Sequence, residues 1–374
     1  MARRSNSEGT VYRRRDGRWV AAVTLDTGRR RCFYGATQRA AQYKLRAARR
    51  AIDDGLPVAS DRQKVGTFLT RWLAEVAQPT VRPSTYIRYR ELLAGHIIPA
   101  VGHLPLVKLS PLDLQGLYAQ LGQRLAPRTV GHCHRVLHKA LADALRFGLV
   151  HRNVCDAVRP PKVARAEMHV LDGDQARALL AAAVGDPLEA LYVLALHAGL
   201  RSGELLALKW ADVDLDAGRL SVNRTVRHMI GLGAVEGEPK SARSRRNVLL
   251  TPLAIAALRR HRTRQAAQRL RATYWDDLDL IFTNEVGRHV QTNNLRLRSF
   301  LPLLDRAGVP AIRFHDLRHS CATLLLLAGV HVKVVSEILG HSNIGLTLDT
   351  YSHVLPSMQA DAVAKMEALF TVAI

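Results

Sequence analysis

A stretch near the C-terminus brings several phosphate-binding types of side chain together. It reads HDLRHSCATLLLLAGVHVKVVSEILGHSNIGLTLDTY and begins at His315. His315 and Arg318 are three residues apart, so on a helix they would lie on one face. His341 follows an apolar run, and Tyr351 ends the stretch. Two imidazoles, a guanidinium and a phenol in one neighbourhood suit an attack on a phosphate group.

Apolar residues at helical spacing predict the helices that would position these side chains. Gly340 follows the last of them and is predicted to end a helix, since glycine adopts the left-handed cap conformation readily. His341 would then lie in the turn directly after that helix. The apolar positions, which we expect to pack into a core, are Leu324, Leu325, Val330, Val332, Val335 and Leu339.

Two further charged segments lie upstream and read AGLRSGELLAL around Arg201 and EPKSARSRRNVLL around Lys240. H-x-L-R-H, L-G-H-S and T-L-D-T-Y-S-H follow them in the C-terminal stretch. In order and spacing, this set resembles the tyrosine recombinases, the family of phage integrases. The resemblance covers the second half of the chain, and a weaker similarity reaches back to residue 9.

The resemblance implies a role for each matched residue. Tyr351 would be the nucleophile, attacking the DNA backbone to form a 3′-phosphotyrosyl link. An unperturbed phenol has a pKa of about 10, so it needs a proton acceptor or nearby cations at neutral pH. Arg201 and Arg318 would hold the non-bridging oxygens, because a guanidinium matches phosphate bidentately and stays charged. His319 and His353, within the same motifs, are interpreted either as structural or as supporting the side chains that touch the phosphate.

The remaining matched residues would move protons or support the site. Lys240 matches the general acid for the leaving 5′ oxygen, although Ser241 follows it where the family often has a threonine. His315 matches a general base or phosphate hydrogen-bond donor, and His341 a second such donor. Glu204, in the R-x-x-E motif, would orient the site.

The formal net charge is +22 over 374 residues. Such an excess favours polyanions, because phosphate neutralisation releases counterions from DNA. By itself, the composition also fits a generally basic surface. No apolar run approaches membrane-spanning length and no hydrophobic signal segment follows the N-terminus, so we expect a cytoplasmic protein. Neither disulfides nor zinc are indicated by the spacing of Cys32, Cys133, Cys155 and Cys321.

No metal or other cofactor is predicted. His134 and His138 are four residues apart on an expected helix, with Cys133 beside the first. On a helix, however, Cys133 would point about 100° away from its neighbour, and no carboxylate partner or cysteine pair is near. We interpret these histidines as part of a solvated or DNA-facing helix surface.

Residues 1–56 are predicted to form a small α+β domain with a three-stranded sheet. TVYRRR, RWVAAVT and RRRCFYG read as strands separated by turns at 16–17 and 26–28. Thr37 is expected to cap a helix over 38–53. The first 64 residues hold 16 Lys/Arg against 6 Asp/Glu, a net +10. This basic sheet resembles the arm-binding domain of many phage integrases, so we expect it to bind DNA.

Residues 65–158 are expected to form an all-α bundle, which resembles the core-binding domain of the family. Ser84 is predicted to cap its second helix and Ser110 its third, with a fourth helix over 127–147. A charged, proline-containing linker would follow. The basic residues proposed for the exposed side of the bundle are Arg128, His132, His134, Arg135 and Lys139.

Residues 166–374 would form a mainly α catalytic domain with a small β-sheet. An apolar helix is predicted from Asp186-Pro187 to His197. Leu220 and Val222 alternate in a predicted strand, and RRNVLL is expected to return as another. The fold class is therefore multidomain.

Several other classes of DNA-acting protein fit the sequence less well. A type IB topoisomerase uses similar tyrosine chemistry, but the separate basic N-terminal domain argues against it. The matched catalytic set argues against a non-catalytic DNA-binding relic. No serine recombinase motif or clear metal-binding carboxylate triad is present. The predicted function is site-specific DNA integration by a recombinase of a phage or mobile element.

The resemblance also predicts the partners. They are double-stranded DNA attachment sites, three further copies of the chain in a synaptic homotetramer, and an accessory directionality factor. Near the C-terminus, apolar residues repeat at helical spacing, and this helix would either fold back on its own domain or dock on a neighbouring protomer. The repeating residues are Ala362, Met366, Leu369 and Phe370.

Overall fold

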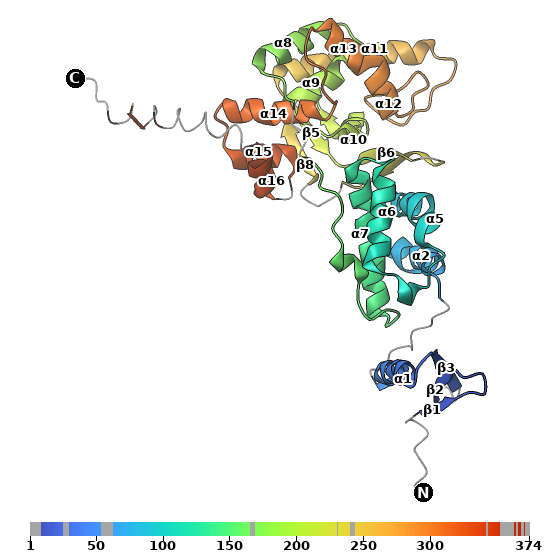
Figure 1. The fold of residues 1–374 in the computed structure, drawn as a ribbon. Coiled ribbons are helices and arrows are strands. Elements are labelled where there is room, and N and C mark those ends of the chain that lie inside the picture. The colour runs from blue at the N-terminus through green and yellow to red at the C-terminus, as the bar shows by residue number, and fades with distance from the viewer. Residues whose placement is uncertain are drawn as a thin grey trace. The chain divides into compact units, whose positions relative to one another are not determined.

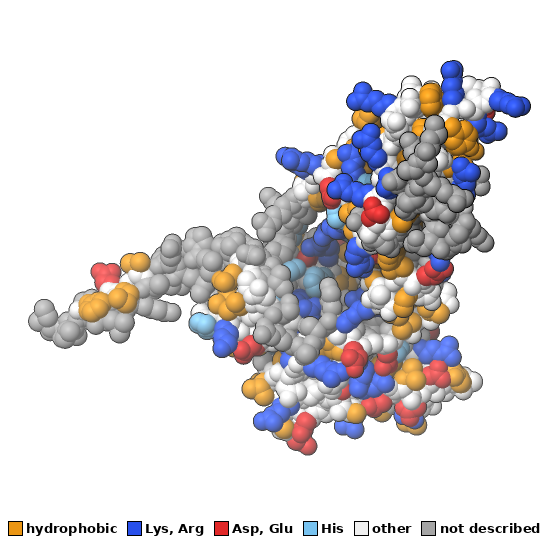
Figure 2. Space-filling view, turned by 90° about the horizontal axis from the view of Figure 1, so that it is seen from below, with side chains coloured by type: hydrophobic (Ala, Val, Ile, Leu, Met, Phe, Trp, Pro, Cys, Tyr) orange, Lys and Arg blue, Asp and Glu red, His pale blue; other side chains and the backbone are white. Residues whose placement is uncertain are grey.

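The computed structural model describes most of the chain, which divides into two compact units, Met1–Arg165 and Ala166–Ile374 (Figure 1). Lys and Arg side chains recur across the face seen in Figure 2, interspersed with fewer carboxylates. The described residues are 9–24, 30–53, 63–164, 169–229, 231–239, 244–341 and 343–351, together with 363, 366, 367 and 370.

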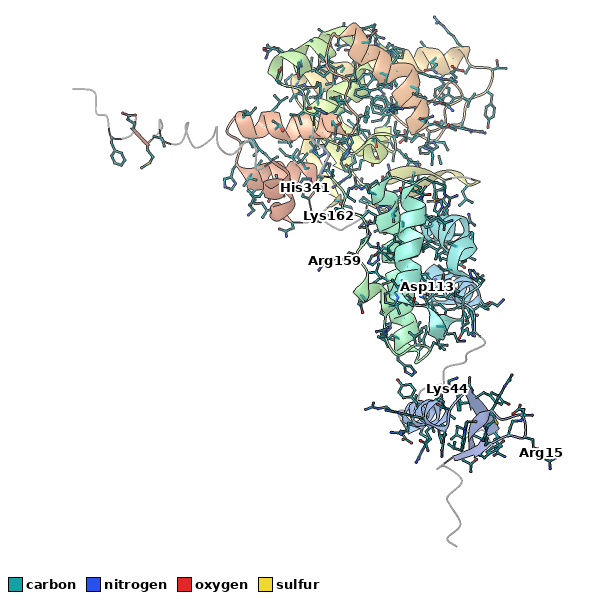
Figure 3. The ribbon with its side chains drawn as sticks, viewed as in Figure 1. Arg15, Lys44, Asp113, Arg159, Lys162 and His341 are labelled. Carbon is teal, nitrogen blue, oxygen red and sulfur yellow. The ribbon has the colours of Figure 1, made fainter. Side chains whose placement is uncertain are left out.

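A three-stranded antiparallel sheet and one helix open the first unit, as predicted. Alternating side chains of the central strand pack against the helix, with Ala21 and Val23 buried against Ala41 and Leu45. The helix is fastened to the third strand by Lys44, whose Nζ donates to the Tyr34 carbonyl at 2.8 Å (Figure 3). These elements are β1 (Thr10–Arg13), β2 (Trp19–Thr24), β3 (Arg30–Gly35) and α1 (Gln38–Asp53).

Local turn and cap chemistry explains these boundaries. Gly17 has a φ of +84° in the β1–β2 turn, a conformation that favours glycine. The Thr37 hydroxyl accepts from the Ala40 backbone N–H at 3.2 Å, which confirms the predicted cap. The turn predicted at 26–28 lies outside the described residues.

The remaining described residues of the first unit are mainly helical, as expected. Two short π-helical turns, Leu73–Ala77 and Leu93–Ile97, continue its helices, and 3₁₀ turns cover Leu106–Lys108 and Val154–Ala157. The α-helices are α2 (Val65–Trp72), α3 (Gln78–Thr80), α4 (Pro83–Leu92), α5 (Ile98–Val101), α6 (Pro111–Gly122) and α7 (Pro127–Arg146).

The sequence predicts some helix ends correctly and one wrongly. Ser110 and Asp113 form the capping box of α6, with the Ser110 N–H donating to Asp113 Oδ2 at 2.9 Å (Figure 3). The cap predicted at Ser84 is wrong: α4 already begins at Pro83, whose fixed φ suits the first helical position. Gly148, with a φ of +66°, follows α7 as predicted.

The prediction that basic residues lie on the exposed side of α7 is correct for Arg128, Arg135 and Lys139. His134 instead turns toward the bundle, where its Nδ1 lies 2.9 Å from the hydroxyl of buried Tyr118. A buried phenol needs a hydrogen-bond partner, and this requirement outweighs the position of His134 on the helix surface.

The second unit contains seven α-helices of more than four residues and two small sheets among its described residues. A 3₁₀ turn covers Trp210–Asp212 and a π-helical segment covers Leu295–Phe300. Its elements are α8 (Gly173–Ala182), α9 (Glu189–His197), α10 (Ser202–Leu205), β4 (Val213–Asp214), β5 (Arg219–Val222), β6 (Thr225–Met229), β7 (Gly233–Gly237), β8 (Arg246–Leu249), α11 (Pro252–Arg271), α12 (Thr292–Asn294), α13 (Leu301–Arg306), α14 (Asp316–Leu327), α15 (Val332–Leu339) and α16 (Ile344–Tyr351).

The predicted pairing of the two strands is confirmed, since β5 and β8 are antiparallel with Leu220 opposite Val248. β4 completes this sheet, in the order β4-β5-β8. β6 and β7 form a separate hairpin that the sequence did not predict. Its strands lack a regular apolar alternation, so their pairing leaves little periodic signal.

α9 lies at the centre of the second unit's core, with every residue from 189 to 196 buried. It begins two residues after Pro187, because the Asp186 carboxylate accepts from the Leu188 N–H at 2.9 Å and forms a turn there. Gly199 follows the helix with a φ of +57°, and a Cβ there would lie 2.6 Å from Leu339 Cδ2. The positive φ and this close approach to α15 together favour glycine here.

Among the described residues, no helix is both long enough and apolar enough to cross a bilayer. All four cysteines are free thiols. The multidomain fold class, with its small N-terminal sheet, helical bundle and mainly helical second unit, is confirmed.

Candidate active site

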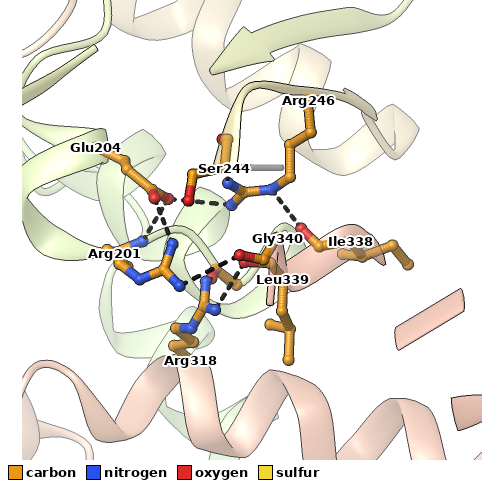
Figure 4. Close-up of polar contacts among 9 residues, drawn as sticks. Arg201, Glu204, Ser244, Arg246, Arg318, Ile338, Leu339 and Gly340 are labelled. Atoms are coloured by element: carbon orange, nitrogen blue, oxygen red, sulfur yellow. Dashed lines mark hydrogen bonds and ion pairs between the residues drawn. The ribbon is translucent and has the colours of Figure 1, made fainter. Parts of the chain in front are cut away.

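Arg201 precedes the short helix α10 and is held by Glu204 one turn later. Glu204 Oε1 accepts from Arg201 Nη1 at 2.7 Å, and Oε2 accepts from the Arg201 backbone N–H at 3.1 Å (Figure 4). The Arg201 side chain is 37% exposed, whereas that of Glu204 is 3% exposed. A buried carboxylate thus directs a guanidinium that still reaches solvent.

Arg318, on α14, is almost completely buried, at 2% exposed. Its Nη1 donates to the Gly199 carbonyl and its Nη2 to the Leu339 carbonyl, both at 2.7 Å (Figure 4). These bonds join the loop after α9 to the end of α15. The direction of the guanidinium is therefore set by backbone atoms from two distant segments.

The C-terminus of α15 is surrounded by three guanidiniums. The carbonyls of Ile338, Leu339 and Gly340 accept from Arg246 at 2.6 Å, Arg318 at 2.7 Å and Arg201 at 3.4 Å, respectively. The last carbonyls of a helix lack partners within it, and its negative dipole end favours cations. We call these three arginines, with Glu204 and the three carbonyls, the arginine corner (Figure 4).

Gly340 ends α15 in the left-handed conformation, with φ +64° and ψ +47°, which confirms its predicted role. His341, labelled in Figure 3, follows Gly340 directly. Its Nδ1 lies 2.7 Å from Thr347 Oγ1 on α16, so the ring is oriented from the next helix.

Burial and positive charge together keep the site's histidines neutral. Desolvation, followed by the charges of Arg318 and Arg201, lowers the pKa of His341 to about 4. Desolvation and the charges of Arg318 and Arg201 also lower the pKa of His315. His315 as a residue is exposed, so solvent weakens these effects there. Desolvation and the neighbouring His315 lower the pKa of His319 to about 4. At neutral pH these imidazoles can therefore accept protons.

Glu204 stays ionised despite its burial. Burial alone would raise the pKa of its carboxyl, but the charges of Arg246 and Arg201 outweigh this effect and hold the pKa below its ordinary value. Each oxygen of Glu204 accepts from at least one guanidinium. The carboxylate consequently fixes the relative orientation of two arginines.

Hydrogen bonds bring Arg201, Glu204 and Arg318 to the end of α15, directly before His341. The charges of the two arginines also lower the pKa of His315 and His341. Chemically, this arrangement offers positive charge for a phosphate and neutral imidazoles beside it. Within the described residues, no group of three His, Cys, Asp or Glu side chains could hold a metal ion.

Two predicted site residues have no described side chain. Lys240 lies outside the described residues. Tyr351 is the last residue of α16, which packs against α15, but its side chain is not among those described. Their proposed roles therefore rest on the sequence.

Sequence reasoning missed Arg246, which begins β8 and is buried within the arginine corner. Its neighbour Arg245 has an exposed side chain paired with Glu238. Strand alternation was the available signal: Arg246 shares a face with the apolar and buried Val248.

The second unit and part of the first match known families. Residues 169–358 match the phage integrase family, and residues 64–122 match the phage integrase N-terminal SAM-like domain. The chain is 31% identical to a tyrosine recombinase XerC-like protein of Caldanaerobacter subterraneus subsp. tengcongensis, covering 95% of this chain and 98% of that relative. It is 30% identical to an integrase of Streptomyces ambofaciens, with 98% of each chain covered.

Solved structures share the fold. The Tn1549 transposon integrase in complex with transposon right end DNA has a TM-score of 0.69 at 21% identity, covering 82% of this chain and 99% of that one. A lambda integrase tetramer bound to a Holliday junction has a TM-score of 0.56 at 18% identity, covering 93% and 96%. With the sequence relatives, these likenesses establish that the chain belongs to the phage integrase family and is a tyrosine site-specific recombinase, an integrase of the phage and mobile-element type.

Proposed function

We propose that the chain cuts and rejoins DNA attachment sites through a 3′-phosphotyrosyl intermediate on Tyr351. The observation that carries this proposal is the arginine corner. It holds the guanidiniums of Arg201 and Arg318 beside the neutral histidines His315 and His341. Preorganised charge of this kind stabilises the transition state of phosphoryl transfer without reorganisation during the reaction.

Cleavage exchanges one phosphoester bond for another. The Tyr351 phenol oxygen attacks the scissile phosphorus, and the bond from phosphorus to the 5′ oxygen breaks. His315 accepts the phenol proton, for which its lowered pKa leaves the imidazole neutral and available. Lys240 gives a proton to the departing 5′ oxygen, and His341 donates a hydrogen bond to the phosphate. The reverse sequence, with a 5′ hydroxyl from another strand, rejoins the DNA.

The three predicted domains would divide the work on DNA. Residues 1–56 bind arm-type sites, residues 65–158 clamp the core site, and residues 166–374 catalyse. Exposed aromatic side chains on the sheet's open face support the first role, since Tyr12 is 43% and Tyr34 49% exposed. The SAM-like family match supports the second.

The working assembly would be a homotetramer on two paired attachment sites, with an accessory factor setting direction. The lambda integrase relative forms a tetramer on a Holliday junction, which supports this stoichiometry. Near the C-terminus, Met366 is 53% and Phe370 76% exposed. Side chains so apolar and so exposed suit docking on a neighbouring protomer.

Covalent trapping on nicked suicide DNA tests the catalytic proposal. Wild-type protein should become attached to the 3′ phosphate. Tyr351→Phe should bind the same DNA with unchanged affinity and form no covalent complex, because phenylalanine lacks the attacking oxygen. A denaturing gel measures the attachment and a gel shift measures the binding.

Two outcomes would contradict this proposal. Attachment by Tyr351→Phe would mean that another residue is the nucleophile. Wild-type protein that binds its attachment site without becoming attached would instead indicate a non-catalytic DNA-binding protein. Tyr274→Phe is a suitable control, since Tyr274 lies outside the matched motifs and is 56% exposed.

A further inference from the structure

Arg246 occupies the arginine corner, yet none of the matched motifs gives it a role. Its side chain is only 7% exposed. Its Nη2 donates to Glu204 Oε2 at 3.0 Å, its Nε to the Ile338 carbonyl at 2.6 Å and its Nη1 to the Ser244 carbonyl at 3.1 Å. The planar guanidinium thus connects β8 with α10 and with the end of α15 (Figure 4).

The first connection leads to Arg201. Glu204 Oε2 is shared between Arg246 Nη2 and the Arg201 backbone N–H, while Oε1 holds Arg201 Nη1. Without Arg246, the buried Glu204 would lose one of its two balancing charges and turn wholly toward Arg201. The partly exposed Arg201 guanidinium would then change its direction.

The second connection leads to His341. Arg246 binds the Ile338 carbonyl, two residues before the left-handed Gly340 and three before His341. The adjacent carbonyls are already bound by Arg318 and Arg201. Arg246 therefore completes the set of donors that holds the turn from which His341 leaves.

We infer that Arg246 is a positioning residue for strand cleavage, acting through Glu204 on Arg201 and through the α15 terminus on His341. It stays beneath the phosphate site and touches no DNA. This inference rests on the proposed function, because it takes Arg201 and His341 to act on the phosphate. One side chain thereby aligns two catalytic groups that lie 140 residues apart in the chain.

Single-turnover cleavage of suicide DNA at saturating protein tests this role. Arg246→Ala should lower the cleavage rate about 100-fold, the cost of a small misplacement at an active site, with unchanged DNA affinity. Arg246→Lys should recover part of the rate, because an ammonium replaces the charge but cannot span all three acceptors. The melting temperature of each variant is measured alongside.

Arg224→Ala is the matched control for lost stability. Arg224 also pairs with a buried carboxylate, Asp212, which is 4% exposed, but neither residue contacts the arginine corner in the described bonds. We expect this variant to lose melting temperature and keep its cleavage rate. If Arg224→Ala and Arg246→Ala lose cleavage equally, Arg246 acts only through stability and the inference fails.

A double-mutant cycle with Arg201→Ala separates the inference from the proposed function. If Arg246 acts largely through Arg201, its removal should cost much less in the Arg201→Ala background than in the wild type. Equal costs in both backgrounds, or wild-type cleavage by Arg246→Ala, would overturn the inference alone. Wild-type cleavage by Arg201→Ala would instead refute the proposed site. If Arg246→Ala does not fold, Arg246→Lys takes its place in the cycle.

Discussion

Two groups of arginines in the second unit are held in different ways. Arg318 is 2% exposed and the side chain of Arg246 is 7% exposed, and both donate to backbone carbonyls of α15. Arg177 and Arg259, by contrast, have side chains 75% and 59% exposed and pair with exposed aspartates. Exposed ion pairs contribute roughly 0–1 kcal/mol, whereas removing one partner of a buried pair costs about 3–5 kcal/mol.

The difference shows that net charge and directed charge are separate properties. An exposed guanidinium adds to the attraction between this chain and DNA, but its solvated side chain has no fixed direction. In the arginine corner, backbone carbonyls and Glu204 hold each guanidinium before any phosphate arrives. Catalysis requires directed charge, because the donors must already face the charge that develops in the transition state.

The largest effect is expected at Arg318. Arg318→Ala should lower the single-turnover cleavage rate by about 10²–10³, as for the loss of one oxyanion donor, and should also lower the melting temperature. Arg318→Lys would keep the charge but cannot bind the Gly199 and Leu339 carbonyls together with a phosphate. Cleavage by Arg318→Ala at the wild-type rate would remove this residue from the site.

A smaller effect, on the unfolding free energy, is expected when the pH is lowered. The pKa of His341 is lowered from its ordinary value of 6.5 to about 4 in the folded chain, so folding disfavours its protonated form. The corresponding stability is present above pH 6.5 and is lost as pH falls through about 4. Solvent screening limits it to at most roughly 3 kcal/mol.

Melting measured from pH 7 to pH 4 in wild type and in His341→Gln checks this linkage. The unfolding free energy of wild type relative to His341→Gln should fall as pH falls, since glutamine does not titrate. A constant difference across this range would show that His341 keeps an ordinary pKa. Carboxylates titrate in both proteins and therefore largely cancel.

The smallest effect is expected at an exposed arginine. Arg177→Ala removes the ion pair with Asp174, whose side chain is 90% exposed. The unfolding free energy should change by less than about 0.5 kcal/mol, and the cleavage rate should stay unchanged. Denaturant unfolding and the suicide-DNA assay measure both quantities. A loss as large as that of Arg318→Ala would remove the distinction between the two groups of arginines.

The sequence by itself determined what depends on neighbouring residues. Turn and cap chemistry predicted the three N-terminal strands, the Thr37 and Ser110 caps and the end of α15 at Gly340, because these bonds span only a few residues. Matching motifs, in order along the chain, predicted the family. The cap at Ser84 failed where two local signals competed and Pro83 prevailed.

Only the tertiary structure decided how the site's side chains are held. The bonds from Arg246 to Ile338, from Arg318 to Gly199 and from Arg201 to Gly340 join residues 92, 119 and 139 positions apart. No local pattern encodes such pairs, since each depends on how α10, β8, α14 and α15 pack. Short sequence motifs identify the catalytic groups, whereas backbone carbonyls that the fold brings close to them set their direction.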